Sequence, residues 1–315
     1  MSEDENRKSF RMDFVTELVE VNDEDGTFKM LAIPDPERYE ERTIDGEEGY
    51  WDTFEEFFIP KEEMQRAAKR SADDLPFYYT PRKIDNINDH IDSRREDIRN
   101  TMSSGLPEHE FEDASEQKLE ELAEENDTRF IILVIDIEGS TELSQRLDSD
   151  ENTKIIQLFQ QEMSILVDVF QGYVLKYGGD GLIAYFPDPD YIGMHDNAID
   201  CATSMIKTVQ QGINPVLEES DLPSLDVRIG MDSGEADIVS MGAEGVKRHR
   251  DLIGRTINVA AKIEGRADTN TIYLGEETER NLHTMWRKNT EEVDVDWDYE
   301  DVDGSDYRLY KFPAT

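Results

Sequence analysis

Residues 172–186 read GYVLKYGGDGLIAYF, a stretch in which apolar residues flank a Gly-Gly-Asp centre. Two short apolar runs separated by consecutive glycines are typical of a β-hairpin, because glycine adopts the backbone angles that a tight turn requires. The stretch therefore predicts two antiparallel strands with Asp180 at the turn. Lys176 lies four residues before this aspartate, on the first of the two strands.

The segments on either side of this hairpin alternate between strand and helix patterns. Residues 129–137, RFIILVIDI, form a nearly continuous β-branched run that predicts a buried central strand. Helical apolar spacing occurs at residues 139–147, 152–171, 195–211 and 256–266, and further strand patterns occur at residues 225–233, 235–241 and 271–275. This order predicts an α+β domain of ferredoxin-like, palm type, with helices covering one face of a mainly antiparallel sheet.

The chain has three regions that differ in their pattern of apolar and charged residues. Residues 1–95 contain short apolar clusters between charged turns, which predicts a small α+β accessory region whose role the sequence does not indicate. Residues 96–127 are acidic and favour helix, so they are interpreted as a connector. Residues 128–315 carry the strong alternation of strands and helices and are expected to form the main domain.

The composition is extremely acidic, with 74 acidic and 33 basic residues and a formal net charge of −41. Such a surface repels nucleic-acid backbones and anionic membranes, so neither is an expected partner. Acidic residues scattered over the whole chain suit the high intracellular salt of a halophile, where screening is strong. The single cysteine, Cys201, excludes an intrachain disulfide, and no apolar run has the length to span a bilayer. We therefore expect a cytoplasmic protein.

Two aspartates can meet at one edge of the predicted sheet. Asp136 lies at the end of the central strand and Asp180 at the hairpin turn, so their carboxylates converge if the two strands are neighbours. Hard divalent cations prefer oxygen ligands, and a pair of such ions can clamp the attacking and leaving oxygens of phosphoryl transfer. The alternative is an ordinary Gly-Gly-Asp turn whose aspartate caps its own loop.

Three motifs in this order resemble the catalytic domain of class III nucleotidyl cyclases, the adenylate and guanylate cyclase family. They are VIDIEGSTELSQRL at 134–147, VLKYGGDGLIAYF at 174–186 and RDLIGRTINVAAKIE at 250–264. The resemblance covers roughly residues 128 to 285. It implies conversion of a nucleoside triphosphate to a 3′,5′-cyclic nucleotide and pyrophosphate, with two Mg²⁺ or Mn²⁺ ions per site.

The resemblance also implies roles for individual residues. Asp136 and Asp180 match the two metal-binding aspartates, assisted by the carbonyl of Ile137. Lys176 matches the residue that contacts the edge of the base, and Asp251 matches its partner. A lysine and an aspartate at these positions are typical of adenine-selective members, so ATP is the expected substrate.

The third motif contains one departure from the family pattern. Asn258 matches the asparagine that orients the ribose, but Lys262 stands where the family usually has an arginine on the α-phosphate. Lysine keeps the charge and loses the planar fork of the guanidinium. Arg266 lies one helical turn after Lys262 and Arg255 lies one turn before Asn258, and either could supply a guanidinium. Arg308 is a candidate contact for the leaving phosphates.

The family's active site forms between two catalytic domains, and this chain carries both sets of residues, so a head-to-tail homodimer is expected. Several alternatives remain. The enzyme could be a uridylate or cytidylate cyclase of the Pycsar antiphage type, and in either case its product could act on a cyclic-nucleotide effector protein. The GGD turn also resembles diguanylate cyclases but lacks their acidic-aromatic continuation. The substitution at Lys262 leaves open an inactive domain with a regulatory role.

Overall fold

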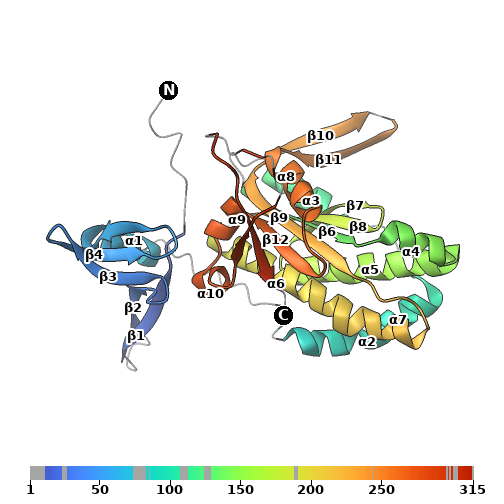
Figure 1. Ribbon diagram of the computed structural model, residues 1–315, viewed down its shortest axis with the longest axis horizontal. Helices are drawn as coiled ribbons and strands as arrows, with labels where there is room; N and C mark the ends of the chain where they lie inside the picture. The colour runs from blue at the N-terminus through green and yellow to red at the C-terminus, as the bar shows by residue number, and fades with distance from the viewer. Residues whose placement is uncertain are drawn as a thin grey trace. The chain divides into compact units, whose positions relative to one another are not determined.

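The computed structural model describes residues 11–22, 27–73, 83–84, 86–106, 113–123, 129–187, 191–243, 245–295, 297, 299–300 and 304–313. The chain divides into two compact units (Figure 1). Unit 1 contains Met1–Pro81 together with His283–Lys288, and unit 2 contains Arg82–Leu282 and Asn289–Thr315. Within the described residues, no helix combines the length and the apolar character needed to cross a membrane.

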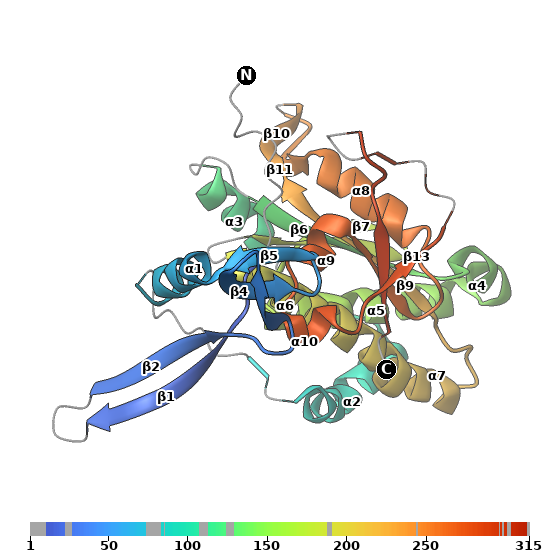
Figure 2. The same cartoon turned by 60° about the vertical axis from the view of Figure 1, so that its left-hand side comes forward.

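The described residues of unit 1 form two small antiparallel sheets and two helices. Its elements are β1 (Phe14–Asn22), β2 (Thr27–Pro34), β3 (Tyr39–Ile44), β4 (Glu47–Asp52), β5 (Phe57–Pro60), α1 (Lys61–Asp73) and α10 (Thr284–Arg287). Strands β1 and β2 form a ribbon, which Figure 2 shows, and β3, β4 and β5 form a meander in chain order. The buried side chains of Tyr39, Ile59 and Met64 form the small core of this unit.

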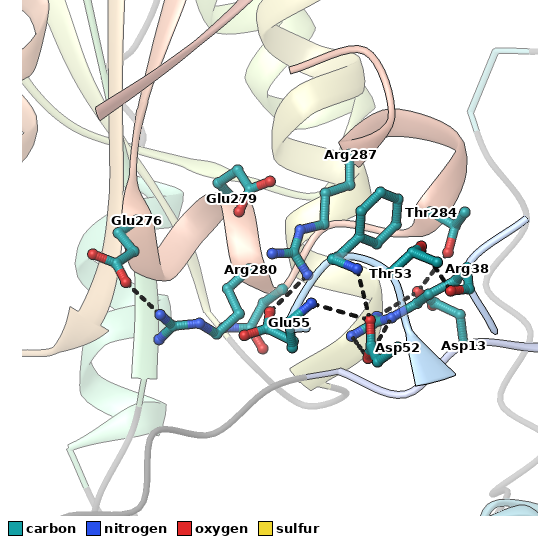
Figure 3. A network of polar contacts seen from close by, with 12 residues as sticks. Asp13, Arg38, Asp52, Thr53, Glu55, Glu276, Glu279, Arg280, Thr284 and Arg287 are labelled. Atoms are coloured by element: carbon teal, nitrogen blue, oxygen red, sulfur yellow. Dashed lines mark hydrogen bonds and ion pairs between the residues drawn. The ribbon is translucent and has the colours of Figure 1, made fainter. Parts of the chain in front are cut away.

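A fully buried arginine lies at the centre of unit 1 (Figure 3). Arg38 donates through Nη1 to Asp13 Oδ2 at 3.0 Å and through Nε and Nη2 to Asp52 Oδ2 at 3.0 and 2.8 Å. Thr284 Oγ1 of α10 donates to the same oxygen of Asp13 at 2.9 Å. Because a buried charge is tolerated only when it is paired and hydrogen-bonded, this network fixes the chain segments that supply it.

Unit 2 contains a seven-stranded sheet of order β13-β14-β12-β9-β6-β8-β7. Its strands are β6 (Arg129–Ile137), β7 (Tyr173–Gly178), β8 (Gly181–Pro187), β9 (Val227–Glu235), β12 (Thr271–Gly275), β13 (Glu291–Val293) and β14 (Leu309–Pro313). Of the pairs in this sheet, β9 with β12 is parallel and the others are antiparallel. Strands β10 (Asp237–Ala243) and β11 (Lys247–Ile253) form a separate two-stranded hairpin.

Helices cover both faces of this sheet (Figure 1), so the expectation of a single covered face was wrong. The helices of unit 2 are α2 (Ile87–Ser104), α3 (Ala114–Leu122), α4 (Ser140–Arg146), α5 (Ser149–Val169), α6 (Tyr191–Thr208), the π-helical turn η1 (Val209–Ile213), α7 (Asn214–Glu219), α8 (Arg255–Glu264) and α9 (Glu276–Arg280). Helices α3 and α8 pack on Phe130, Ile132 and Val134 of β6, whereas α5 and α6 lie on the other side. The two faces are possible because β6 is apolar at nearly every position, so it buries both sets of side chains.

The predicted α+β fold is confirmed, and the predicted hairpin corresponds to β7 and β8. Residues 96–127, predicted to be a connector, supply the second half of α2 and all of α3 to unit 2. Residues 107–112 and 124–127 of that segment lie outside the described residues. Helix α2 packs on α5, where Arg94 pairs with the buried Glu162 at 2.8 Å.

Candidate active site

The structure brings Asp136 and Asp180 together. Strand β6 pairs with β8 up to Ile135 and Leu182, so the end of β6 lies beside the turn of the hairpin. Gly181 makes the approach possible, because a Cβ atom at this position would lie 2.6 Å from Asp136 Oδ1 and 2.5 Å from the Ile135 carbonyl oxygen. Side chains alternate along a strand, and Asp136 therefore continues the face of Val134 and Ile132, toward α8.

The electrostatics of this pair favour a bound cation. Burial, together with the nearby charges of Asp180 and Glu264, raises the pKa of Asp136 to about 7. Asp180 Oδ2 is buried and has no hydrogen-bond partner. A buried carboxylate oxygen without a donor is costly, and an ion between the two aspartates would remove that cost. The residues present therefore fit a divalent cation.

Two further charged residues border the aspartates. Glu264 at the end of α8 pairs with Arg228 of β9 at 3.3 Å, and Arg228 lies opposite Asp136 in the β6–β9 ladder. Burial raises the pKa of Glu264, and Arg228 opposes this shift. Nevertheless, no group of three or more His, Cys, Asp or Glu side chains within the described ranges is placed to hold a metal. Any further ligands would come from the main chain, such as Ile137 at the last position of β6, or from water and substrate.

Lys176 and Asp251 also lie together. Lys176 Nζ of β7 is 3.2 and 3.4 Å from the carboxylate oxygens of Asp251 on β11, and the lysine side chain is the more exposed of the two, at 45% against 16%. Both residues line a cavity of about 560 Å³, whose wall includes Tyr173, Tyr177 and His249. The pair presents a donor and an acceptor side by side to this cavity.

Asn258 and Lys262 lie one turn apart on α8, and both are exposed. Asn258 Nδ2 donates to the Gly254 carbonyl at 3.4 Å, a long hydrogen bond that a substrate oxygen could replace. The Lys262 ammonium lies 4.9 Å from the centre of the Tyr299 ring, which is the distance of a cation–π contact.

The other arginines near α8 differ in how strongly they are held. The Arg255 guanidinium lies 5.0 Å from the ring centres of Tyr299 and Tyr307 and donates to the Glu300 carbonyl at 3.1 Å. Arg266 is exposed. Arg255 contacts two aromatic rings whereas Lys262 contacts one, so Arg255 is the more strongly held of these two side chains.

Arg308 is held by acidic residues. Its guanidinium pairs with Glu276 at 3.0 Å and more weakly with Glu292 at 3.8 Å, and the hydrogen bond to Glu276 raises the pKa of Arg308. Its suggested contact with the leaving phosphates stays a prediction.

Sequence reasoning missed Glu264, Arg228 and Tyr299. Glu264 had a local signal, since it lies two residues after Lys262 in the third motif. Arg228 could have been found only from strand order, because its neighbour Asp136 is distant in sequence. Tyr299 lies in an acidic segment with no helical or strand periodicity, so no pattern pointed to it.

Comparison with known proteins shows the family of the chain. A model of the adenylate and guanylate cyclase catalytic domain family matches residues 122–304, more than half of the chain. A cytidylate cyclase from Escherichia coli is 26% identical over 170 residues, which are 50% of this chain and 36% of that protein. An adenylate cyclase from Anabaena cylindrica is 30% identical over 165 residues, which are 49% of this chain and 31% of that protein. The chain thus covers about a third of the length of these relatives.

Solved structures show the same fold. The adenylyl cyclase CyaB from P. aeruginosa superimposes with a TM-score of 0.52 at 20% identity, covering 59% of this chain and 94% of that chain. Since residues 122–304 match the family model and unit 2 has the fold of its solved members, the chain belongs to the adenylate and guanylate cyclase catalytic domain family, the class III nucleotidyl cyclases.

Proposed function

We propose that the protein converts a nucleoside triphosphate to its 3′,5′-cyclic nucleotide and pyrophosphate. The observation that carries this proposal is the meeting of Asp136 and Asp180, with a buried and unpartnered oxygen on Asp180. In the reaction the ribose 3′ oxygen forms a bond to the α-phosphorus and loses its proton to solvent. The bond from that phosphorus to the oxygen bridging the β-phosphate breaks, and pyrophosphate leaves with the electron pair.

The residues have separate roles in this proposal. Asp136, Asp180 and the Ile137 carbonyl would hold two Mg²⁺ or Mn²⁺ ions. When bound, such ions would lower the pKa of the attacking 3′ hydroxyl and neutralise negative charge on the phosphates. Asn258 would hold the ribose in line for attack, and Lys262 would stabilise the negative charge that develops on the α-phosphate.

The pair Lys176–Asp251 favours particular bases. A lysine only donates hydrogen bonds and an ionised aspartate only accepts them. Adenine offers a ring-nitrogen acceptor beside an amino donor, and so does cytosine, whereas guanine and uracil present an N–H beside a carbonyl oxygen. We therefore propose ATP as the substrate and CTP as the second candidate. The relative named cytidylate cyclase supports the second candidate, and UTP fits the pair less well.

A head-to-tail homodimer is proposed as the active form, because one chain carries both the metal-binding and the base-reading residues. The β10–β11 hairpin supports this assembly. It exposes Met241, Val246 and Ile253, and Val246 is 87% exposed. Large apolar side chains exposed along one hairpin are typical of a surface that another chain covers.

The direct test is incubation of the purified protein with each of the four nucleoside triphosphates and Mg²⁺ or Mn²⁺, with products identified by mass. The proposal predicts a cyclic nucleotide and pyrophosphate from ATP or CTP. Formation of a linear dinucleotide would support the diguanylate cyclase alternative instead. No product from any triphosphate with either metal would support an inactive regulatory domain.

The base-reading assignment predicts that the double substitution Lys176→Glu with Asp251→Lys reverses the base preference. An acceptor now faces the ring nitrogen and a donor faces the exocyclic group, so GTP and UTP become the better substrates. The ratio of kcat/KM for ATP over GTP should fall by about a hundredfold or more, because unpaired buried polar groups dominate such discrimination. A matched control exchanges the helical pair of exposed Asp150 and half-buried Lys154, 2.7 Å apart, and should leave the ratio unchanged. An unchanged ratio in the first variant would refute the assignment.

A second prediction concerns the lysine on α8. Lys262→Arg should raise kcat by up to about tenfold without changing base preference, because a guanidinium offers several fixed donors to the α-phosphate where an ammonium is a point charge. Arg266→Lys, one turn further along the helix, tests the other candidate: it should have little effect if Lys262 contacts the α-phosphate and should lower kcat if Arg266 does. A fall in kcat for Lys262→Arg would indicate that another cationic side chain already contacts the α-phosphate where the new guanidinium would bind.

A further inference from the structure

Helix α3 precedes the catalytic sheet in the chain and contacts the strand that carries Asp251. Strand β11 pairs with β10 in a two-stranded hairpin, and among the described residues no strand pairs with its other edge. On this edge the backbone N–H of Arg250 donates to Glu116 Oε2 at 2.8 Å. The Arg250 guanidinium donates through Nη1 to Glu116 Oε1 at 2.9 Å and through Nη2 to Glu120 Oε1 at 2.9 Å. Both oxygens of Glu116 are thus bound to the residue that immediately precedes Asp251.

Helix α3 is itself anchored to the sheet. Leu119 and Leu122 are buried in the cluster that contains Tyr185 of β8 and Leu252 of β11. The Tyr185 hydroxyl donates to the Ser115 carbonyl oxygen at 3.1 Å. These contacts fix the helix against the strands, so the carboxylate of Glu116 is held at a defined place relative to the sheet.

The same helix borders the cavity that Lys176 and Asp251 line. Asp113, Ala114 and Ser115, at the start of α3, form part of its wall. The Asp113 carboxylate accepts from the Glu116 backbone N–H at 2.9 Å, which caps the helix at the point where it meets the cavity. Helix α3 therefore reaches the base-reading pair both through the cavity wall and through Arg250.

We propose that Glu116 is a positioning residue for base recognition, because it fixes β11 through Arg250 so that Asp251 stays beside Lys176. This inference rests on the proposed function, in which that pair reads the base. A partly exposed ion pair alone contributes little to stability. The hydrogen bond to the backbone N–H of Arg250 differs in kind, because it fixes the position of the β11 main chain, and within the described part of the chain no other strand pairs with that edge.

The test compares Glu116→Ala and Glu116→Gln with Glu121→Gln. Glu121 lies on the same helix and pairs with Lys118 at 3.3 Å. For each protein, kcat and KM are measured with all four nucleoside triphosphates, and amide hydrogen exchange is measured in residues 247–253. Glu116→Ala should lower the discrimination between preferred and disfavoured bases by about tenfold. The change should come from a higher KM for the preferred base, because a displaced Asp251 no longer completes the hydrogen bonds that this base makes with the Lys176–Asp251 pair. Exchange in β11 should accelerate in the same variant.

Glu116→Gln keeps one carbonyl acceptor and should lie between the wild type and the alanine variant, whereas Glu121→Gln should equal the wild type in both measurements. Two outcomes would overturn the inference: unchanged discrimination in an active Glu116→Ala protein, or an equal loss for all four nucleotides. If the wild type forms no cyclic nucleotide, the proposed function fails by itself. The exchange of β11 then still decides whether Glu116 holds the strand, and unaltered exchange in both Glu116 variants would reject that role.

Discussion

Asp136→Ala and Asp180→Ala are each expected to lower kcat/KM by at least about a thousandfold, because either substitution removes half of the carboxylate pair that would hold the metals. The double variant should be no worse than the single ones, since ligands that act as a unit have non-additive effects. The measurement is cyclic nucleotide formed per enzyme at saturating Mn²⁺. Asp150→Ala, an exposed acidic residue of α5, is the control and should retain full activity.

A mixing experiment extends this prediction to the proposed dimer. Asp136→Ala and Asn258→Ala should each be inactive alone, but a mixed dimer would contain one site with both wild-type residues if each site draws on two chains. Activity should therefore reappear when the two inactive proteins are combined and allowed to exchange subunits. Substantial activity in either single aspartate variant would refute the metal assignment, and failure of exchanged mixtures to recover activity would refute the shared site.

Arg38→Met is expected to destabilise unit 1 by about 3–5 kcal/mol, because it removes the guanidinium that pairs with the buried carboxylate of Asp52 and one of the two that pair with Asp13, the other being that of Arg11. The effect should appear as faster amide hydrogen exchange in residues 39–60. Arg42→Met is the control: this arginine pairs with Glu40 at 2.6 Å but is 44% exposed, so its loss should cost no more than about 1 kcal/mol. Equal exchange in the two variants would show that the buried network is not what holds the unit.

Local patterns in the sequence predicted much of the sheet. The hairpin of β7 and β8 and the apolar strand β6 were predicted because their signals, a glycine turn and a continuous β-branched run, lie within a few residues. The meeting of Asp136 and Asp180 followed once these strands were assumed to be neighbours. The pairing of Lys176 with Asp251 came from the family resemblance, since the two residues lie 75 positions apart and no local pattern relates them.

Other contacts could not be predicted from the sequence. Glu116 and Arg250 lie 134 positions apart, and in a chain with 74 acidic residues almost any arginine has many candidate partners. The coverage of both faces by helices depends on where α3 packs, and its two buried leucines gave too short a pattern to show this. Long-range pairing of charges is decided by the assembled sheet, which composition and periodicity do not encode.

Helix α10 has a consequence for the gene, because the accessory region cannot be removed or exchanged as one continuous segment. Residues 283–288 belong to unit 1, although unit 2 supplies the chain on both sides of them. A protein cut after Pro81 would keep this hexapeptide but lose Asp13, the partner of Thr284, and Glu55, which pairs with Arg287 at 2.8 Å. A region joined by a single linker can be deleted, exchanged or duplicated by one recombination event. Here two distant gene segments must change together, so the two units are expected to be inherited as one piece.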